Sequence, residues 1–282
     1  MRDPLSKTIK TIEPSGIRKF FDLVSEMDDA ISLGVGEPDF DTPWHIRDEG
    51  IYSLEKGRTF YTSNAGLKDL KIEIAKYLDR RFDLHYDYNK EIFVTVGGSE
   101  AIDLTMRAML DPGDEVLIPQ PSYVSYVPCC VLANGTPVII ELKAENEFRL
   151  TAEELEAAIT PKTKLLVMPF PNNPTGAVME RADLEAVAEV VKKHDLYVLS
   201  DEIYCELTYG ESCIDRIPSG NEGAHDRGQR ILEVPCDDRM ETRLCVRTGS
   251  NLEADAQDSP VCNHVCTDDE PVCGNRGAAQ RR

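Results

Sequence analysis

Hydrophobic residues gather in five short runs within the first 210 residues of the chain. The runs are rich in Val, Ile and Leu, and Gly, Pro or Asp residues bound them. Buried parallel strands have this composition because helices cover both faces of the sheet. We therefore predict strands at residues 92–96, 115–119, 137–142, 164–168 and 196–200.

Between these runs, apolar residues recur at helical spacing. Leu70, Ile74 and Leu78 share one side of a predicted helix. Thr151 and Glu154 form a Thr-x-x-Glu capping box, which marks the start of another helix. The predicted helices are residues 67–82, 100–110, 151–159 and 181–194. Repeated alternation of strand and helix predicts an α/β fold with a mostly parallel central sheet and flanking helices.

The residues that follow the predicted strands are the candidate site, because ligands bind at the carboxyl ends of parallel strands. A glycine turn, 97–98, leads into a helix start that suits a phosphate. Tyr123 follows the second strand, and a turn of two prolines and two asparagines, 171–174, follows the fourth. Asp201 follows the fifth strand, where a buried acid needs a cationic or protonated partner.

Together with two earlier motifs, these strand ends resemble the pyridoxal-phosphate (PLP) aminotransferases of the aspartate aminotransferase family, fold type I. The resemblance runs from about residue 14 to residue 210, and its five motifs follow the family's order. The motifs are Gly-Val-Gly-Glu-Pro-Asp-Phe at 34–40, Tyr-Thr-Ser-Asn-Ala-Gly at 61–66, Val-Gly-Gly-Ser-Glu-Ala at 96–101, Pro-Asn-Asn-Pro-Thr-Gly at 171–176 and Ser-Asp-Glu-Ile-Tyr at 200–204.

The resemblance implies how the ring of the cofactor would be held. Asp201 would pair with the pyridine nitrogen, where a carboxylate keeps the ring protonated and electron-withdrawing. Tyr204 and Asn173 would hydrogen-bond the phenolic oxygen. Tyr123 would stack on the pyridine ring, although the packing of an isolated tyrosine into the core would also explain it.

The resemblance also implies a phosphate site, a substrate site and a partner. The backbone N–H groups of Ser99 and Glu100 would hold the phosphate at the start of a helix. Tyr61 would reach the phosphate of the neighbouring subunit, because the family's sites lie at the interface of a homodimer. Gly36 and Asn173 would contact the substrate carboxylate. The implied reaction transfers an amino group between an amino acid and a 2-oxo acid.

Residues 211–282 differ sharply from the rest of the chain. These 72 residues contain no Phe, Tyr, Trp or Lys, although they hold six of the nine cysteines. The resemblance implies a catalytic lysine a few tens of residues after Tyr204, and it is missing. We therefore expect that no catalytic residue is retained and that this chain is inactive. A non-catalytic binding protein on the same fold, or a related PLP lyase or synthase, stays open as an alternative.

A shifted reading frame would explain the composition of this stretch. A gain of one base or a loss of two bases near Gly210 or Glu211 would place every later codon out of register. The lesion could be real or an error in the recorded sequence, and re-sequencing the DNA decides between them. On this hypothesis residues 211–282 are an out-of-frame tail and are expected to be disordered, because they offer little apolar surface to bury.

The genetic code allows this hypothesis to be checked against the residues. Met240 must be ATG and the codon of Glu241 begins with G, so the original codon between them is TGG, tryptophan. Extended in this way, residues 230–242 are compatible with Gly-Phe-Ser-Lys-Ser-His-Ala-Met-Thr-Gly-Trp-Arg, the family's lysine motif. Residues 261–274 are compatible with Phe-Ala-Ile-Met-Cys-Ala-Pro-Thr-Thr-Ser-Gln-Tyr-Ala, which is also family-like.

The expected domain organisation follows from this division. Residues 1–40 would be an N-terminal arm with part of a small domain, 41–210 an incomplete PLP-binding large domain, and 211–282 the out-of-frame tail. A zinc site made by Cys262, Cys266, Cys273 and His264 is the competing reading of the tail. Its spacing is irregular and has no paired C-x-x-C, so we expect no metal.

Charge and composition narrow the classes of partner. The 282 residues carry 51 acidic and 31 basic side chains, a net charge of -20. This balance argues against nucleic acid or an anionic membrane as a partner. No apolar run is long enough to span a bilayer, and the polar first ten residues do not form a secretory signal. We therefore expect a cytoplasmic protein, in which the odd number of cysteines does not form a disulfide framework.

Overall fold

The computed structural model describes residues 2–12, 41–82, 84–209, 231–233 and 242–247. The chain divides into two compact units, Met1–Thr42 and Pro43–Arg282. In the first unit, the described residues contain one short 3-10 helix, η1 (Ile9–Thr11). Everything that follows concerns the second unit.

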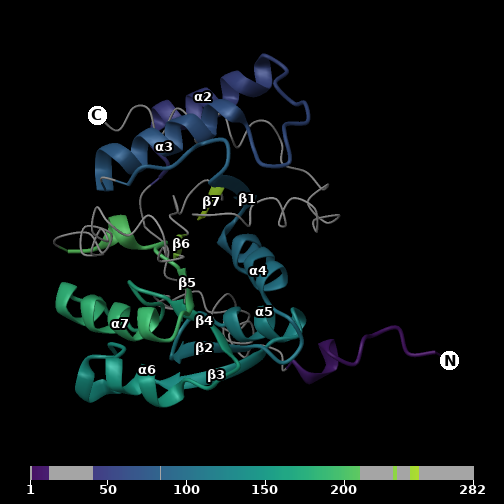
Figure 1. The fold of residues 1–282 in the computed structure, drawn as a ribbon. Helices are drawn as coiled ribbons and strands as arrows, with labels where there is room; N and C mark the ends of the chain where they lie inside the picture. The colour runs from purple at the N-terminus through teal and green to yellow at the C-terminus, as the bar shows by residue number, and fades with distance from the viewer. Residues whose placement is uncertain (1, 13–40, 83, 210–230, 234–241, 248–282) are drawn as a thin grey trace, which may run out of the picture. The chain divides into compact units, whose positions relative to one another are not determined.

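A seven-stranded sheet forms the centre of the second unit's described part (Figure 1). The order of the strands across the sheet is β1-β7-β6-β5-β4-β2-β3. Neighbouring strands run parallel from β6 to β3, whereas β7 is antiparallel to both β1 and β6. The strands are β1 (Ile92–Val96), β2 (Glu115–Gln120), β3 (Thr136–Glu141), β4 (Thr163–Met168), β5 (Tyr197–Ser200), β6 (Ile231–Glu233) and β7 (Thr242–Arg247).

The predicted mostly parallel α/β fold is confirmed. All five predicted strands are present, and their ends differ from the prediction by no more than one residue. The agreement has a physical cause: β2 and β4 each bury four consecutive residues, so both faces of these strands must be apolar. A run of apolar residues is therefore a sufficient signal for them.

The structure differs from the sequence-based expectation in residues 211–282, where no regular structure was expected. Two strands, β6 and β7, lie in this stretch and fill the sheet between β5 and β1. Five residue pairs join β7 to β1, and three pairs join β6 to β5. Strand pairing uses backbone N–H and C=O groups, which every residue except proline offers, so it does not require a family-like side-chain pattern.

Helices cover both faces of the sheet. The four predicted helices are present, and the capping box of α6 is confirmed: Thr151 Oγ1 accepts from Glu154 N–H at 3.2 Å, and Glu154 Oε2 accepts from Thr151 N–H at 3.3 Å. Two helices, α2 and α5, were not predicted. The helices are α2 (Trp44–Glu55), α3 (Lys68–Phe82), α4 (Gly98–Met109), α5 (Tyr126–Leu132), α6 (Ala152–Ala158) and α7 (Arg181–Lys193).

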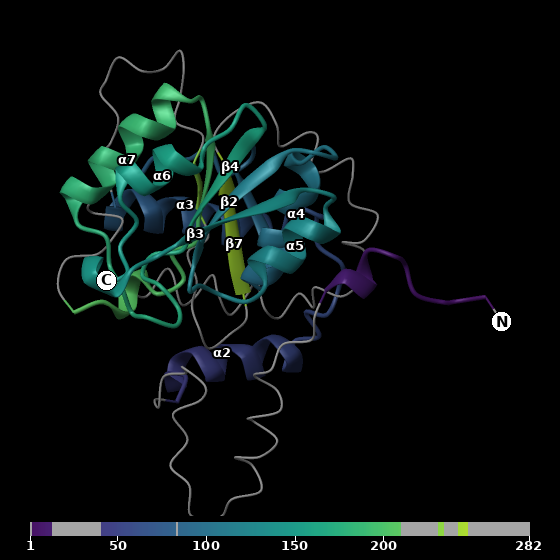
Figure 2. The same ribbon diagram turned by 90° about the horizontal axis from the view of Figure 1, so that it is seen from below.

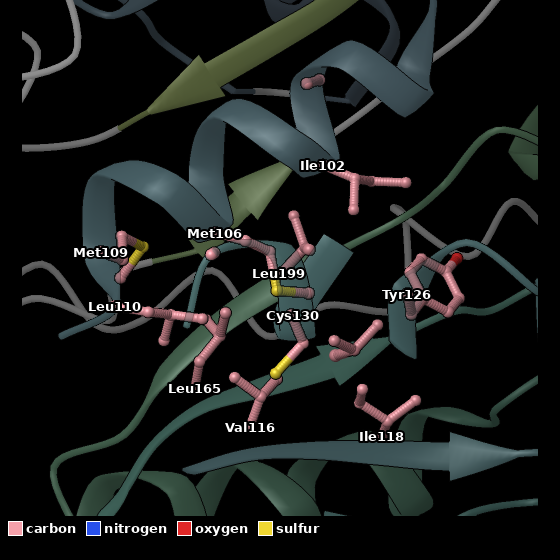
Figure 3. Close-up of a cluster of buried hydrophobic side chains, with 13 residues drawn as sticks. Ile102, Met106, Met109, Leu110, Val116, Ile118, Tyr126, Cys130, Leu165 and Leu199 are labelled. Carbon is pink, nitrogen blue, oxygen red and sulfur yellow. The ribbon is translucent and has the colours of Figure 1, made fainter. Parts of the chain in front are cut away.

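The sheet has a separate hydrophobic core on each face. Figures 1 and 2 show α4 and α5 on one side of the strands and α6 and α7 on the other. On the first side, Met106 of α4 and Cys130 of α5 pack against Val116, Leu165 and Leu199 of the strands (Figure 3). A fully buried side chain of this size contributes roughly 2 kcal/mol to stability. This core fixes the start of α4 relative to the ends of β2, β4 and β5.

A third cluster joins α3 to β1. Leu70, Ile74 and Leu78 of α3 are buried against Ile92 and Val94 of β1. These three helix positions are the ones that the sequence placed on one side. The packing holds the first turn of α3 beside the edge strand of the sheet.

Candidate active site

A pocket of about 150 Å³ lies where strand ends meet the start of α4. We call it the Asp201 pocket. Three loops that follow β2, β4 and β5 supply most of its wall, as expected for a parallel sheet. It is lined by Gly98, Ser99, Ile102, Tyr123, Tyr126, Pro169, Pro171, Asn173, Asp201, Ile203 and Tyr204.

Asp201 lies at the end of β5 and is only 7% exposed. Its backbone N–H donates to the Met168 carbonyl at 2.9 Å, which continues the pairing of β4 with β5 by one residue. The Oδ2 atom accepts from the Tyr126 hydroxyl at 2.7 Å, and Oδ1 accepts from the Ile203 N–H at 3.3 Å. These donors offset part of the cost of burying a carboxylate.

Tyr126 is a site residue that the sequence analysis missed. It is 2% exposed, and its ring meets the Tyr123 ring edge-on with 5.7 Å between the centroids. Burial, followed by the charge of Asp201, raises the pKa of Tyr126 well above its ordinary value. The phenol therefore stays protonated at neutral pH, as its hydrogen bond to Asp201 requires. The only sequence signal was a second tyrosine three residues after Tyr123.

Two further hydrogen bonds join the side chains that the sequence analysis selected. The hydroxyls of Ser99 and Tyr123 lie 3.1 Å apart. Asn173 Nδ2 donates to the Tyr204 hydroxyl over 3.4 Å. Five predicted cofactor residues thus line one pocket, with an acidic end at Asp201 and a helix start at Ser99.

The turn that carries Asn173 is anchored by its neighbour, Asn172. Asn172 Nδ2 donates to the Pro121 carbonyl at 3.1 Å. The backbone carbonyl of Asn172 accepts from the Gly176 N–H at 2.8 Å. The first bond links the loop after β4 to the loop after β2. The position of Asn173 is therefore coupled to the loop that bears Tyr123.

Glu100 does not line the pocket. Its N–H donates to the Gly97 carbonyl at 3.2 Å, and its carboxylate accepts from the Val96 N–H, so both groups close the first turn of α4. Gly97 has φ +84°, a conformation that suits glycine and lets the strand turn into the helix. Of the two residues predicted to hold a phosphate, only Ser99 lies in the pocket wall.

Tyr61 lies away from the Asp201 pocket and is 92% exposed. It lines a second cavity of about 760 Å³ beside α3, which shares no lining residue with the first. Gly36 belongs to residues 13–40, outside the described part of the chain. The four residues of the alternative zinc site, 262, 264, 266 and 273, also lie outside it.

Helix α5 carries two cysteines, the half-buried Cys129 and the buried Cys130, and both have raised pKa values. Burial raises the pKa of Cys129 to about 11 and that of Cys130 to about 12, so both stay protonated at neutral pH. Among the described residues, no group of three or more His, Cys, Asp or Glu side chains could hold a metal ion. In the same part of the chain, no helix combines the length and the apolar composition that a membrane span requires.

The arrangement defines an α/β protein with a ligand pocket at the carboxyl ends of parallel strands. The family model for aminotransferase class I and II matches residues 28–240, and the chain belongs to this family. A relative from Bacillus subtilis is 52% identical over 211 residues, which cover 75% of this chain and 55% of the relative. The aspartate aminotransferase of Pyrococcus abyssi is 45% identical over 207 residues, which cover 73% of this chain and 53% of that protein.

Solved structures of the family agree with the fold. The crystal structure of an aromatic aminotransferase from Pyrococcus horikoshii superposes with a TM-score of 0.80 at 33% identity. The superposition covers 95% of this chain and 71% of that one. This chain spans about half the length of the curated relatives that it matches.

Proposed function

We propose that the intact form of this protein is a PLP-dependent aminotransferase that moves an amino group between an amino acid and a 2-oxo acid. The observation that carries the proposal is the buried Asp201 carboxylate, which faces the same pocket as the start of α4. An acid at one end and free helix N–H groups at the other suit a cationic ring nitrogen and a phosphate, respectively.

The donors and acceptors of the pocket fit PLP along its length. Asp201 would hold the proton of the pyridine nitrogen, and Tyr126 keeps that carboxylate oriented through a 2.7 Å bond. Asn173 and Tyr204, already hydrogen-bonded to each other, would donate to the phenolic oxygen. Ser99 would contribute a hydroxyl and an N–H to the phosphate. When bound, PLP supplies the electron-withdrawing ring on which transamination depends.

We further propose that this chain binds PLP without covalent capture and does not turn over. Residues 211–282 contain no lysine, so the amine that would hold the cofactor and move the substrate proton is missing from the stretch where the family has it. The frame-shift hypothesis explains this loss. The family model's match runs on to residue 240, 30 residues past Gly210, the point at which re-sequencing of the DNA tests this hypothesis.

We propose a homodimer for the intact protein. Support comes from Tyr61, which is exposed and remote from its own Asp201 pocket. A side chain in this position is free to reach a neighbouring subunit. We name the substrates only as an amino acid and a 2-oxo acid, because the relatives include both an aspartate and an aromatic aminotransferase.

A PLP titration of the purified chain tests the cofactor proposal. The unaltered chain should bind PLP reversibly, and borohydride treatment should leave no pyridoxyl group on any lysine of the chain. Asp201→Asn should weaken binding at least tenfold, since a hydrogen bond to a charged group is worth about 1.5–3 kcal/mol. Asp195→Asn, at an exposed acid with φ +53° just before β5, is the matched control and should bind as the unaltered chain does.

Two outcomes would contradict the proposal. Equal PLP affinity in the Asp201 and Asp195 variants would remove Asp201 from the site. Transamination by this exact chain would refute its inactivity. Activity only in a chain expressed from DNA with the reading frame restored after Gly210 would support both the family activity and the frame-shift hypothesis.

A further inference from the structure

Asn172 joins two of the loops that build the Asp201 pocket. Tyr123 lies in the loop after β2 and Asn173 in the turn after β4, and both line the pocket. Asn172 Nδ2 donates to the Pro121 carbonyl at 3.1 Å, so it bridges positions 51 residues apart in the chain. One end of this bond lies next to Asn173, and the other lies just before Tyr123. The bond therefore ties together two segments of the pocket wall.

Asn172 is also held firmly within its own turn. Its backbone N–H donates to the Ala177 carbonyl at 2.9 Å, and its backbone carbonyl accepts from the Gly176 N–H at 2.8 Å. Gly176 has φ +70°, which suits glycine and lets the turn close on itself. Because these two bonds fix the Asn172 backbone, its side-chain bond to Pro121 positions the whole turn, including Asn173.

Burial separates Asn172 from the residues that would touch a ligand. It is 4% exposed and is not among the lining residues of the Asp201 pocket. Its Oδ1 atom is buried and has no hydrogen-bond partner within the described residues. Burying an amide with one group unpaired costs free energy that a single net hydrogen bond offsets only in part. A gain in stability thus does not account for an amide at this position, whereas a link between two loops does.

Two hydrogen-bonded pairs of the pocket wall are connected by this link. The Asn173 amide donates to the Tyr204 hydroxyl over 3.4 Å, and these residues follow β4 and β5. The Tyr123 hydroxyl lies 3.1 Å from that of Ser99, and these residues follow β2 and β1. The side-chain bond of Asn172 joins the first pair to the second, so the two parts of the wall keep a fixed separation.

We propose that Asn172 is a positioning residue for the cofactor, which holds the Asn173 amide at the phenolic oxygen and sets its distance from the Tyr123 ring. The proposal rests on the proposed function, because the roles of Asn173 and Tyr123 come from it. Asn172 itself touches no ligand. Its effect on binding should therefore be confined to the ligand atom that Asn173 contacts.

Titration calorimetry with two ligands measures this effect. Pyridoxine 5′-phosphate keeps the phenolic oxygen but has an alcohol in place of the aldehyde, so it cannot form an imine with a lysine. Its 3-deoxy analogue lacks the phenolic oxygen. The unaltered chain should bind the first ligand more tightly, and Asn172→Leu should reduce this preference about threefold or more, as for the loss of a neutral hydrogen bond. In an Asn173→Ala background, Asn172→Leu should reduce it no further, because it acts through Asn173.

The matched control is Thr175→Val, in the same turn. Thr175 Oγ1 accepts from the Ala177 N–H at 3.2 Å, a bond that stays within the turn and does not reach the loop after β2. This variant should keep the ligand preference of the unaltered chain.

Hydrogen–deuterium exchange without ligand tests the link independently. Asn172→Leu should speed exchange in residues 122–126 and 171–177, whereas Thr175→Val should speed it only in 171–177. Unchanged exchange in α7 shows that each variant is folded. Asn172→Ala, which also lacks the donor and adds no bulk, takes the place of the Leu variant if that variant does not fold.

Equal ligand preference in the Asn172→Leu and Thr175→Val variants would overturn the proposal, as would faster exchange confined to 171–177 in both. If the unaltered chain binds the two ligands equally, Asn173 does not contact the phenolic oxygen and the positioning role fails, while the Asp201→Asn test of the proposed function still stands. If the chain binds neither ligand, the proposed function fails and the positioning of a cofactor fails with it.

Discussion

The Asp201 pocket and the cavity of about 760 Å³ beside α3, here called the Lys71 cavity after one of its lining residues, place a buried charge in opposite circumstances. Asp201 accepts from the hydroxyl of Tyr126, which follows β2, and from the backbone N–H of Ile203 in its own loop after β5. Lys71 is as deeply buried, but no described group hydrogen-bonds its ammonium. The fold thus supplies hydrogen-bond donors to the Asp201 carboxylate, whereas no described residue supplies an acceptor to the Lys71 ammonium.

This difference shows that burial alone does not identify the role of a charged residue. The carboxylate lies where strand ends converge, so the segment that follows β2 can contribute a donor, Tyr126. The lysine lies on one helix beside a turn, and few polar groups reach it. Asp201 and Lys71 have nearly the same exposure, so they are distinguished by their hydrogen-bonding partners and not by burial. The following predictions probe this contrast, from the largest expected effect to the smallest.

Of the variants considered, Gly66→Ala, in the wall of the Lys71 cavity, should lower the free energy of unfolding most. Gly66 has φ +95°, and an added Cβ would lie 2.7 Å from two side-chain atoms of Val94. Backbone strain and overpacking together should lower the free energy of unfolding by about 2–4 kcal/mol, measured by urea unfolding. Gly57→Ala is the control: it has φ +64° with nothing within 4 Å, so only the strain remains. Equal losses would show that the contact with Val94 is unimportant.

Tyr126→Phe should weaken the Asp201 pocket by removing one hydroxyl. The ring and its contact with Tyr123 stay, but Asp201 loses its 2.7 Å donor. The free energy of unfolding should fall by about 1.5–3 kcal/mol, as for other hydrogen bonds to charged groups. Tyr88→Phe should change little, because the described residues give the Tyr88 hydroxyl no hydrogen bond. A matching loss in both variants would argue against a special role for Tyr126.

Lys71→Met should act in the opposite direction and stabilise the protein at neutral pH by roughly 1 kcal/mol, because it removes a desolvated charge. The pKa of Lys71 is lowered in the folded state from its ordinary value of 10.5. Between the folded pKa and 10.5, the unfolded chain binds more protons, so the stability of the unaltered protein rises with pH. Urea unfolding from pH 7 to 10.5 should therefore show the difference between the two proteins shrinking. A difference that grows with pH would contradict the lowered pKa.

Ser99→Ala should have the smallest effect on stability. It removes a 3.1 Å hydrogen bond between two neutral hydroxyls, worth about 0.5–1 kcal/mol in thermal or urea unfolding. Ser125→Ala, at a nearby serine whose side chain makes no capping hydrogen bond, should be closer to neutral. If Ser99→Ala lowers the free energy of unfolding as much as Tyr126→Phe does, the neutral hydrogen bond of Ser99 is as strong as the bond to the Asp201 carboxylate, which would contradict this prediction.

The sequence was sufficient for the elements whose burial leaves a clear pattern. The buried strands and the stripe on α3 were found in this way. The five residues of the Asp201 pocket were instead selected by their positions after the strands and by the family resemblance of their motifs. Helix α2 was missed because only Ile46 and Ser53 of its twelve residues are buried, which leaves no periodic stripe. Helix α5 has seven residues and includes Pro128, so it offers neither length nor a polar face.

Other features depend on distances that no local pattern encodes. Tyr123 and Tyr126 stand in one short segment, and only the fold determines which of them meets Asp201. Lys71 lies on the buried side of α3, four residues after Leu67 and three before Ile74, so its position is apolar in pattern although its side chain is charged. Strands β6 and β7 were missed because backbone pairing needs no distinctive side chains.

The order of the strands gives β6 and β7 a consequence for ligand binding. Ser99 follows β1 and Asp201 follows β5, and these two strands are not neighbours: β7 and β6 lie between them in the sheet. Two inserted strands act as a spacer that sets the gap between the phosphate end and the acidic end of the Asp201 pocket, together with the packing of α4 on the sheet. The width of the pocket thus depends partly on the two strands that separate β1 from β5 in the sheet.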